Sequence, residues 1–312
     1  MTRIENTDLD VFPLCFGGNV FGWTADEQQS FTLMDAYAAA GGNFIDTADV
    51  YSAWASGNSG GESEVIIGNW MAARGNRGDV VVATKVGWAP DFKGLSAKNI
   101  REAADASLKR MQTDYIDLYY AHYDDQDVPL EETLTALDGL VQEGKVRYLA
   151  ASNYTAPRLA EALEISKRDG LARYVALQPR FNLIDRERYS TELADLVAAE
   201  GIACLPYLAL ADGFLTGKYR ANGGQVDTGR AEKALAHVNE GSLAALDVLT
   251  EVAAAHNAPV AAAALAWLAA QPSVVAPIAS ARTTTQLAEL LTMAELRLSV
   301  EELNRLNDVS AR

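Results

Sequence analysis

Residues 80–122 read VVVATKVGWAPDFKGLSAKNIREAADASLKRMQTDYIDLYYAH, and this stretch predicts a strand, a helix and a second strand. The runs Val80–Lys85 and Tyr115–His122 are rich in Val, Ile and Tyr. They are continuous rather than alternating, as expected of strands buried on both faces. Ser96 is a good N-cap for the helix between them. The same order, a short apolar run and then a helical pattern, recurs along the chain.

Six further runs have the same character and bring the candidate strands to eight. They are Pro13–Gly17, Asn43–Ala48, Val146–Ser152, Tyr174–Gln178, Ile202–Tyr207 and Val274–Ser280. The helices between strands have recognisable starts: Thr24-x-x-Glu27 predicts a capping box, Pro129 predicts the first residue of a helix, and Thr155 predicts an N-cap. This alternation predicts a closed parallel (β/α)8 TIM barrel. An open doubly wound sheet is the alternative, although its usual Gly-x-Gly-x-x-Gly fingerprint is absent.

No linker or low-complexity tract divides the 312 residues, so we expect residues 1–312 to form a single domain. Two pieces lie outside the plain repeat. Leu208–Gly241, after the seventh strand, predicts a long loop without a strand, and such loops at this end of a barrel are usually functional. Ser299-x-x-Glu302 predicts an extra C-terminal helix that reaches about Asn307 and packs over the barrel.

Composition excludes several classes of function. Hydrophobic residues make up 49% of the chain and charged residues 22%, which is enough for a large core. Asp plus Glu number 42 against 26 Lys plus Arg, a net charge of −16 that disfavours nucleic-acid and membrane-surface partners. The longest apolar run, Val260–Ala270, predicts a buried helix, since a bilayer needs roughly 20 residues. The first ten residues lack an apolar signal core, so we expect a cytoplasmic protein.

The sequence lacks the motifs that metal binding, nucleotide hydrolysis and serine hydrolysis usually require. The histidines at 122, 237 and 256 have no partner at metal-ligand spacing, so no metal site is expected. The segment 213–218 resembles a phosphate-binding loop but is one residue short, and no Gly-x-Ser-x-Gly is present. Cys15 and Cys204 lie in apolar runs and are interpreted as core thiols, with a disulfide or redox pair as the alternative.

Polar residues gather where the predicted strands end. Asp46, Lys85 and His122 end three consecutive strands, and Tyr51 follows Asp46 closely. Catalytic groups of barrel enzymes cluster at these C-terminal ends. Taken singly, Lys85 is typical of a snorkelling lysine, Tyr51 of a loop tyrosine and His122 of a hydrogen-bonded histidine. The four together favour one catalytic site.

The chain resembles the aldo-keto reductase family over essentially its whole length. The matching stretches are Asn43-Phe-Ile-Asp-Thr-Ala-Asp-Val-Tyr51, Gly61-Glu-Ser-Glu-x-x-Ile-Gly68, Thr84-Lys85, Thr113-Asp-Tyr-Ile-Asp-Leu-Tyr-Tyr-Ala-His122, Gly144-Lys-Val-Arg-x-x-x-x-Ser-Asn153, Leu177-Gln178 and Leu215-Thr-Gly-Lys-Tyr219. The resemblance implies a metal-free, reversible reduction of an aldehyde, ketone or sugar carbonyl with NAD(P)H.

The resemblance also implies catalytic roles that suit these residues. Tyr51 would be the general acid, although a free tyrosine with a pKa of about 10 is a poor acid at neutral pH. Lys85 would lower that pKa, and Asp46 would hold Lys85 in place. His122 would orient the carbonyl or relay the proton. An Asp46 deprived of Lys85 would be an unpaired buried charge, so the two should fail together.

A second cluster of residues is interpreted as the cofactor site. Thr283-x-x-Gln286 predicts a capping box beside Arg282, and a helix N-terminus after the eighth strand is an anion site. In the family that the chain resembles, this arginine lies near the 2′-phosphate, so the resemblance implies that Arg282 favours NADPH over NADH. The resemblance extends cofactor binding to Gly18, Asn19, Ser152, Asn153, Gln178, Tyr207, Leu210, Gly213, Leu215, Lys218, Ser280, Thr284 and Gln286. Leu208, Asp212 and Leu290 depart from the family pattern and put the tightness of binding in doubt.

Trp23, Trp54, Trp88 and Tyr123 follow strands and are interpreted as substrate-pocket residues, with ordinary loop anchors as the alternative.

A nucleotide-sensing regulatory subunit, like the beta subunits of voltage-gated potassium channels, is the alternative function. The four catalytic residues, and a start without the long extension that such subunits often carry, favour the reductase. An unrelated lyase or hydrolase using Asp46 and His122 would leave Arg282 unexplained. No signal for an oligomeric state is visible.

Overall fold

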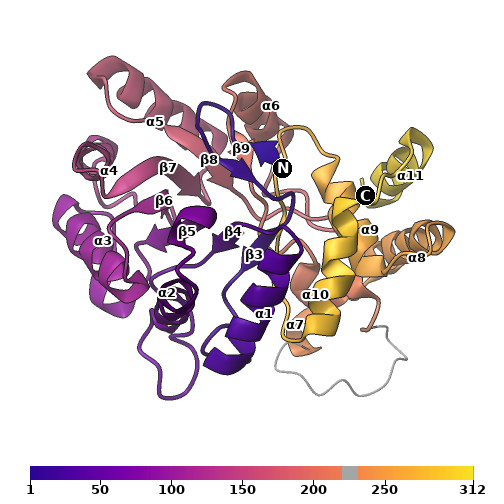
Figure 1. The fold of residues 1–312 in the computed structure, drawn as a ribbon. Coiled ribbons are helices and arrows are strands. Elements are labelled where there is room, and N and C mark those ends of the chain that lie inside the picture. The colour runs from indigo at the N-terminus through magenta and orange to yellow at the C-terminus, as the bar shows by residue number, and fades with distance from the viewer. Residues whose placement is uncertain (220–230, 312) are drawn as a thin grey trace.

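The computed structural model describes residues 1–219 and 231–311 and contains an eight-stranded parallel sheet surrounded by helices (Figure 1). The strand order is β10-β3-β4-β5-β6-β7-β8-β9. Their bounds are β3 (Cys15–Gly17), β4 (Phe44–Asp46), β5 (Val81–Val86), β6 (Ile116–Ala121), β7 (Val146–Ser152), β8 (Tyr174–Gln178), β9 (Ala203–Cys204) and β10 (Ile278–Ala279). A parallel bridge from Cys204 to Val274 joins the ends of the sheet. The predicted (β/α)8 barrel is confirmed.

Each predicted strand is present, but five are shorter than expected, and the last two have only two residues each. Their runs Ile202–Tyr207 and Val274–Ser280 contain Pro206 and Pro277, which have no N–H to donate to a neighbouring strand. The two prolines still accept: Cys15 donates to the Pro277 carbonyl and Ile278 to that of Pro206, both through backbone N–H groups. The barrel therefore closes through isolated bonds rather than a long ladder.

The helices lie on the outside of the sheet (Figure 1). Their bounds are α1 (Glu27–Ala39), α2 (Glu62–Arg74), α3 (Ala97–Met111), α4 (Leu130–Gln142), α5 (Ala156–Asp169), α6 (Thr191–Ala199), α7 (Ala231–Leu235), α8 (Glu240–Ala255), α9 (Val260–Ala269), α10 (Thr284–Leu291) and α11 (Val300–Ser310), with short 3-10 turns η1 (Arg77–Asp79), η2 (Pro90–Phe92), η3 (Ala211–Thr216) and η4 (Thr292–Ala294). The buried apolar run predicted as a helix is α9, which begins after Pro259.

The helix starts in the structure agree in part with those predicted from the sequence. Ser96 caps α3, and Ser299 and Glu302 form the predicted capping box of α11. The capping box predicted at Thr24 is wrong, because Asp26 caps α1 through the N–H of Gln29. Asp26 directly precedes the helix, and the negative charge of its carboxylate is stabilised by the positive end of the helix dipole. Thr155 is positioned as the N-cap of α5, but its side chain makes no capping hydrogen bond.

An N-terminal hairpin, β1 (Thr2–Arg3) and β2 (Asp10–Val11), was not predicted from the sequence. Ile4, Leu9 and Val11 are buried and belong to the apolar cluster inside the barrel. Arg147, at the start of β7, donates to both oxygens of Asp8 at 2.7 and 2.9 Å. The hairpin therefore closes the end of the barrel at which the strands begin.

The segment after β9 is the irregular part of the fold. It contains η3 and α7, and the predicted long loop over 208–241 falls partly on residues 220–230, which lie outside the described residues. The extra C-terminal helix is confirmed as α11, which packs beside α8 on the outer surface (Figure 1). Arg305 on α11 is paired with Glu251 on α8, and Trp267 on α9 donates to Asn307 at 3.1 Å.

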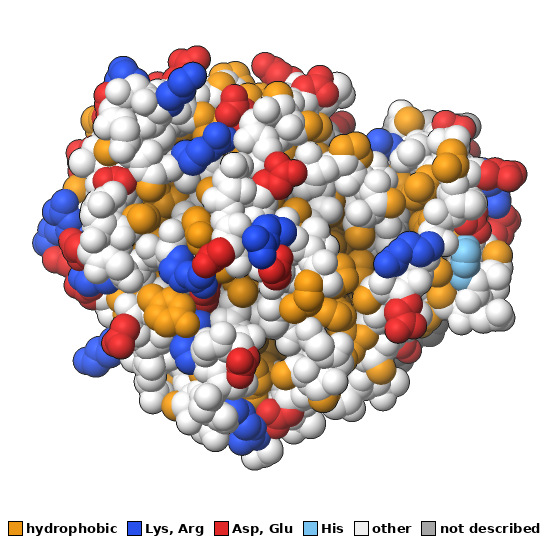
Figure 2. Space-filling model, turned by 45° about the horizontal axis from the view of Figure 1, so that its top comes forward, with side chains coloured by type: hydrophobic (Ala, Val, Ile, Leu, Met, Phe, Trp, Pro, Cys, Tyr) orange, Lys and Arg blue, Asp and Glu red, His pale blue; other side chains and the backbone are white. Residues whose placement is uncertain are grey.

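Most charged side chains lie on the surface of the protein (Figure 2), and both cysteines lie in its interior. Acidic and basic side chains are interspersed over the face shown in Figure 2. Cys15 and Cys204 are buried, free thiols. Across the described ranges, no single helix is long and apolar enough to span a membrane, and the one pair that passes together, α8 and α9, is bent by 99°.

Candidate active site

The alternation of side chains along the strands places the catalytic candidates. Val81 and Ala83 on β5 belong to the cluster inside the barrel, whereas Val82 faces the helices. Because successive side chains of a strand point to opposite faces, the next inward position on β5 is Lys85. The same step takes Phe44 to Asp46 on β4. The barrel core thus ends, on these strands, in a charged pair.

The same rule adds two neighbours. On β6, Leu118 and Tyr120 lie inside the barrel, so His122 is the next inward position. On β8, Ala176 lies inside and Gln178 follows it. These four side chains therefore form a polar layer on top of an apolar barrel core, at the end where the strands finish.

Lys85 is the centre of this layer. Its side chain is 0% exposed, and its Nζ donates to Asp46 Oδ2 at 2.7 Å and to the Tyr51 hydroxyl at 3.0 Å. It also donates to the Thr47 carbonyl at 2.7 Å, while Tyr51 donates to Asp46 Oδ2 at 3.2 Å. Gln178 donates to the second Asp46 oxygen at 2.8 Å. The structure thus brings together three of the four predicted catalytic residues in one hydrogen-bonded network.

His122 lies beside this network rather than in it. Its ring centroid is 6.3 Å from that of Tyr51, and its buried Nδ1 has no hydrogen-bond partner among the described residues. Burial, with the Lys85 charge as a smaller cause, holds the pKa of His122 well below its usual value. His122 is therefore a neutral imidazole at physiological pH.

The sequence predicts that Lys85 lowers the pKa of Tyr51, but the surroundings of the hydroxyl shift this pKa in the opposite direction. Burial, and then the Asp46 carboxylate, raise the pKa of Tyr51 well above its usual value. The Lys85 charge is shared with Asp46, which lies closer to Nζ than the phenol does. Because Tyr51 also donates to Asp46, the protonated phenol is the stabilised form.

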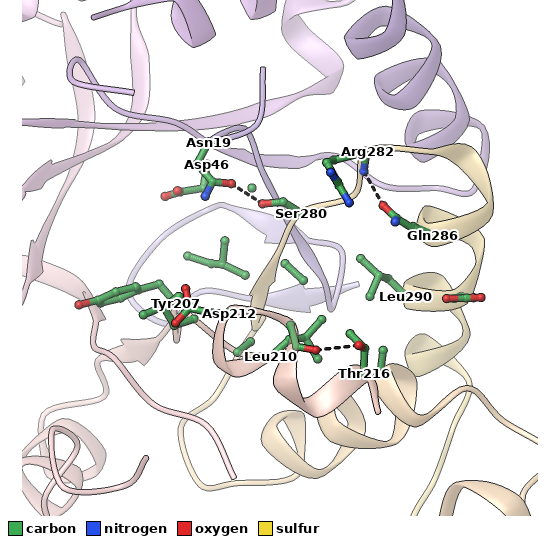
Figure 3. Close-up of a pocket in the computed structure, with 18 of the residues that line it drawn as sticks. Asn19, Asp46, Tyr207, Leu210, Asp212, Thr216, Ser280, Arg282, Gln286 and Leu290 are labelled. Carbon is green, nitrogen blue, oxygen red and sulfur yellow. Dashed lines mark hydrogen bonds between the residues drawn. The ribbon is translucent and has the colours of Figure 1, made fainter. Parts of the chain in front are cut away.

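A cavity of about 250 Å³ runs from this network to α10 (Figure 3). Asp46 and Tyr51 line one end, and Arg282 and Gln286 line the other. Of the predicted cofactor residues, those that line it are Asn19, Tyr207, Leu210, Gly213, Lys218, Ser280, Arg282 and Gln286. Most of the predicted cofactor set thus surrounds one continuous cavity.

The remaining predicted cofactor residues do not line the cavity. Leu215 is 0% exposed, because its side chain packs from η3 into the core, and Thr284 is exposed at the start of α10. Ser152 is buried and donates to the Gln178 carbonyl, and Asn153 accepts from the Tyr207 hydroxyl at 2.8 Å. These latter contacts place Ser152, Asn153 and Gln178 beneath or beside the cavity wall. Gly18 donates to the Asp46 carbonyl and supports that residue through the backbone.

Sequence reasoning missed part of the lining. The additional residues are Gly17, Ala209, Thr216, Tyr219, Ala261, Ile278, Ala279 and Glu289. Glu289 lies one helical turn after Gln286, so the helical period of α10 was a signal that could have found it. The small residues Ala209, Ala261 and Ala279 carry no chemical signal of their own.

The far end of the cavity suits an anion. Thr283 caps α10 through the Gln286 N–H, while the Gln286 side chain accepts from the Arg282 backbone N–H at 2.9 Å (Figure 3). The predicted capping box is therefore only half formed. No ion pair to the Arg282 guanidinium is found in the described parts of the chain, and a helix N-terminus adds positive potential. These residues fit a phosphorylated dinucleotide.

The three departures from the family pattern all line this cavity. The Asp212 carboxylate is bonded to the His237 ring at 3.0 Å, which joins η3 to the segment after α7. Asp212 has φ 56°, a left-handed conformation that glycine adopts without strain. Leu208 and Leu290 contribute apolar surface in place of hydrogen-bonding side chains.

The predicted substrate residues form an aromatic mouth around Tyr51 and His122. Trp54 contacts Tyr51 and Trp23 with centroid separations of 6.0 and 5.8 Å. Trp88 lies 4.3 Å from the His122 ring and stacks on Tyr123 at 5.6 Å.

Within the described residues, no cluster of three or more His, Cys, Asp or Glu could hold a metal ion.

A parallel barrel that joins a Lys–Tyr–Asp network to a long cavity with a basic end has the features of a nicotinamide-dependent oxidoreductase. Residues 13–311 match the Aldo/keto reductase family. Uncharacterized oxidoreductase YrpG of Bacillus subtilis is 34% identical over 99% of this chain and 95% of that protein. A probable voltage-gated potassium channel subunit beta of Oryza sativa is 34% identical, covering 92% and 88%. Norsolorinic acid reductase B of Aspergillus parasiticus is 32% identical, covering 96% and 81%.

The chain therefore belongs to the aldo-keto reductase family and is an NAD(P)H-dependent oxidoreductase.

Proposed function

We propose that the protein uses NADPH to reduce an aldehyde or ketone to the alcohol, with Tyr51 as the proton donor. One observation carries this proposal: Lys85, Tyr51 and Asp46 form a hydrogen-bonded network at one end of a cavity whose other end holds Arg282. A nicotinamide held in this cavity would supply hydride to the carbonyl carbon. The residues of the chain then have to supply a proton to the oxygen and stabilise the charge that develops there.

Tyr51 suits the proton transfer although its pKa is raised. A raised pKa keeps the hydroxyl protonated throughout the physiological range. When the carbonyl carbon receives hydride, the carbonyl oxygen takes on alkoxide charge and becomes a far stronger base than a phenolate, so the proton moves to it readily. Lys85 donates to the Tyr51 oxygen at 3.0 Å and stabilises the phenolate that remains. Asp46 holds Lys85 in position.

His122 suits orientation of the substrate rather than proton supply. The depressed pKa keeps the ring neutral, so it acts as a hydrogen-bonding group near the carbonyl oxygen. Its place beside Tyr51 and beneath Trp88 directs the carbonyl toward the phenol. The relay considered from sequence is therefore the less favoured role.

The preference for NADPH is tested by titration of the purified protein with NADPH and with NADH, followed through intrinsic tryptophan fluorescence. We expect saturable quenching by both, with the lower dissociation constant for NADPH. Arg282→Ala should weaken NADPH binding about tenfold, as expected for loss of a charge-assisted contact to phosphate, and should barely change NADH.

Arg101→Ala is the matched control, because Arg101 is an exposed arginine on α3 and does not line the cavity. Equal weakening of NADPH and NADH by Arg282→Ala would contradict a contact with the 2′-phosphate. Oxidation of NADPH in the presence of aldehydes and ketones, followed by its absorbance, tests the reaction itself.

A regulatory, nucleotide-sensing protein is the second candidate function, because the rice relative is named as a channel subunit. That function predicts NADPH binding without appreciable turnover of any carbonyl. The reductase named among the relatives, and the complete network around Lys85, favour the enzyme.

A further inference from the structure

Tyr51 is carried by a short turn that follows β4. The Tyr51 N–H donates to the Ala48 carbonyl at 3.1 Å, and the Asp49 N–H donates to the Lys85 carbonyl at 3.3 Å. The turn is therefore bonded through its backbone to the same residue whose Nζ contacts the Tyr51 hydroxyl. A displacement of Asp49 would move Tyr51 relative to Lys85.

The Asp49 side chain, two residues before Tyr51, is buried without a partner. It is 1% exposed, and neither carboxyl oxygen has a hydrogen-bond partner among the described residues. The backbone N–H groups of Val50 and Gly87 lie near it, but not at hydrogen-bond geometry. An ionised carboxylate here would lack the hydrogen bonds that a buried charge needs. The neutral carboxyl is therefore the form that fits this place.

The groups around Asp49 do not supply a free positive charge. Glu64 on α2, Arg110 on α3 and Tyr119 on β6 lie close enough to act on it electrostatically. The Arg110 guanidinium already donates to Glu64 at 2.6 Å and to the Ser107 hydroxyl at 3.2 Å. Burial, and then Glu64, raise the pKa of Asp49 to about 8, and Arg110 offsets only part of this rise.

A surface pocket of about 610 Å³ borders Asp49. Three further carboxylates line it, those of Glu27, Glu62 and Asp91, so the pocket does not neutralise a negative charge. It does open to water. An ionised Asp49 would gain hydration by moving toward this pocket, and the turn that carries Tyr51 would move with it.

We propose that Asp49 is a positioning residue for Tyr51: its neutral carboxyl keeps the turn in place, and its ionisation withdraws the Tyr51 hydroxyl from Lys85. The inference rests on the carbonyl reduction proposed above, in which Tyr51 supplies the proton. Activity should therefore fall with rising pH because of a carboxyl on the outer face of the barrel. Burial raises the pKa of Tyr51 and lowers that of His122, so neither residue accounts for a loss near pH 8.

The first test is the pH profile of kcat for the NADPH-dependent reduction of benzaldehyde. We expect kcat of the unmodified protein to fall about tenfold per pH unit above about pH 8, as a single ionisation requires. Asp49→Asn cannot ionise and should remove this fall. Glu64→Gln removes a charge that raises the pKa of Asp49, so the fall should begin at lower pH. A merely structural role of Asp49 would lower kcat equally at every pH.

The second test needs no turnover. Hydrogen–deuterium exchange of residues 44–54, corrected for the intrinsic exchange rate, is compared between neutral and alkaline pH. At one pH unit above the pKa of Asp49, we expect the Asp49 and Tyr51 amides to exchange about tenfold faster. Asp49→Asn should abolish this response. Asp114→Asn is the matched control, because Asp114 is exposed between α3 and β6, and it should behave as the unmodified protein in both tests.

The two tests separate this inference from the proposed function. An alkaline fall in kcat that survives Asp49→Asn, or corrected exchange that is the same at both pH values, would overturn the role of Asp49. If the exchange responds as expected while no aldehyde is reduced, the link between Asp49 and Tyr51 holds and the reductase function is wrong.

Discussion

Thr84 and Lys85 are neighbours on β5, yet their side chains enter two buried polar clusters on opposite faces of the strand. The inner cluster is the network of Lys85, Asp46, Tyr51 and Gln178, which opens into the cavity proposed for the cofactor. In the outer cluster, Glu64 accepts from Thr84 at 2.6 Å and from Arg110 at 2.6 Å, beneath α2 and α3.

The difference lies in what each ion pair can reach. Asp46 and Lys85 touch a cavity and a titratable hydroxyl, so their charges can act on a ligand. Glu64 and Arg110 join a strand and two helices, so their charges act on the fold. Burial and an ion pair alone therefore do not identify a catalytic site; access to a cavity does.

The largest expected effect comes from breaking one pair on each side. Lys85→Met and Arg110→Met each leave a buried carboxylate without its partner, which should cost about 3–5 kcal/mol of unfolding free energy. Urea denaturation measures this loss. We expect the folded fraction of Arg110→Met to keep its kcat and that of Lys85→Met to lose it.

Double variants serve as controls. Glu64→Gln with Arg110→Met, and Asp46→Asn with Lys85→Met, remove both charges and should regain much of the stability. Only the outer double variant should retain activity. If both double variants were equally active, the distinction between the clusters would be wrong.

The next effect concerns a single hydroxyl on each side of the sheet. Tyr51→Phe should lower kcat for carbonyl reduction by about 10², because the proton donor is lost, while NADPH binding is unchanged. Tyr119→Phe is the matched control, since its buried hydroxyl has no partner among the described residues and faces the outer cluster. Steady-state kinetics and NADPH titration measure both; undiminished kcat in Tyr51→Phe would remove it from its role.

A pH effect should come from the outer face. Burial, and then Glu64, raise the pKa of Asp49 to about 8. The folded protein therefore keeps a proton on Asp49 between about pH 4 and 8, where the unfolded chain has released it, so stability falls as pH rises through this window. The slope is about 1.4 kcal/mol per pH unit for one proton. Asp49→Asn should flatten it, as measured by urea denaturation between pH 5 and 8; an unchanged slope would contradict the raised pKa.

The smallest effect concerns a less buried acid. Asp212 lines the cavity (Figure 3), and among the described residues its carboxylate is paired with His237. Asp212→Gly removes a carboxylate from a site for phosphates and relieves a left-handed backbone position, so KM for NADPH and NADH should both fall about threefold. His237→Gln keeps the carboxylate and should not lower either KM. A change confined to NADPH would place Asp212 near the 2′-phosphate instead.

Much of this could be predicted because strong patterns act over short distances. The inward positions that end in Asp46 and Lys85 follow from continuous apolar strands, and the (β/α)8 repeat follows from their number. The N-terminal hairpin was missed because its strands have two residues each and depend on tertiary contacts such as Asp8 with Arg147.

Other properties depend on distances that no sequence pattern contains. The direction of the shift in the Tyr51 pKa depends first on the burial of the hydroxyl and then on its distance from the Asp46 carboxylate. Leu215 matches a family position, but its side chain is buried on the core side of η3, because side-chain direction within an irregular turn has no period. Asp26 replaced Thr24 as the cap of α1 because both are good caps and only the backbone path chooses between them.

The N-terminal hairpin also determines how the protein can be attached to other materials. The hairpin covers the barrel end opposite the cavity proposed for the cofactor, and Met1 is 69% exposed beside it. Tethering through Met1 should therefore leave the cavity entrance facing the solution. An immobilised or fused form made in this way would keep cofactor and substrate access, provided that Ile4, Leu9 and Val11 stay in place.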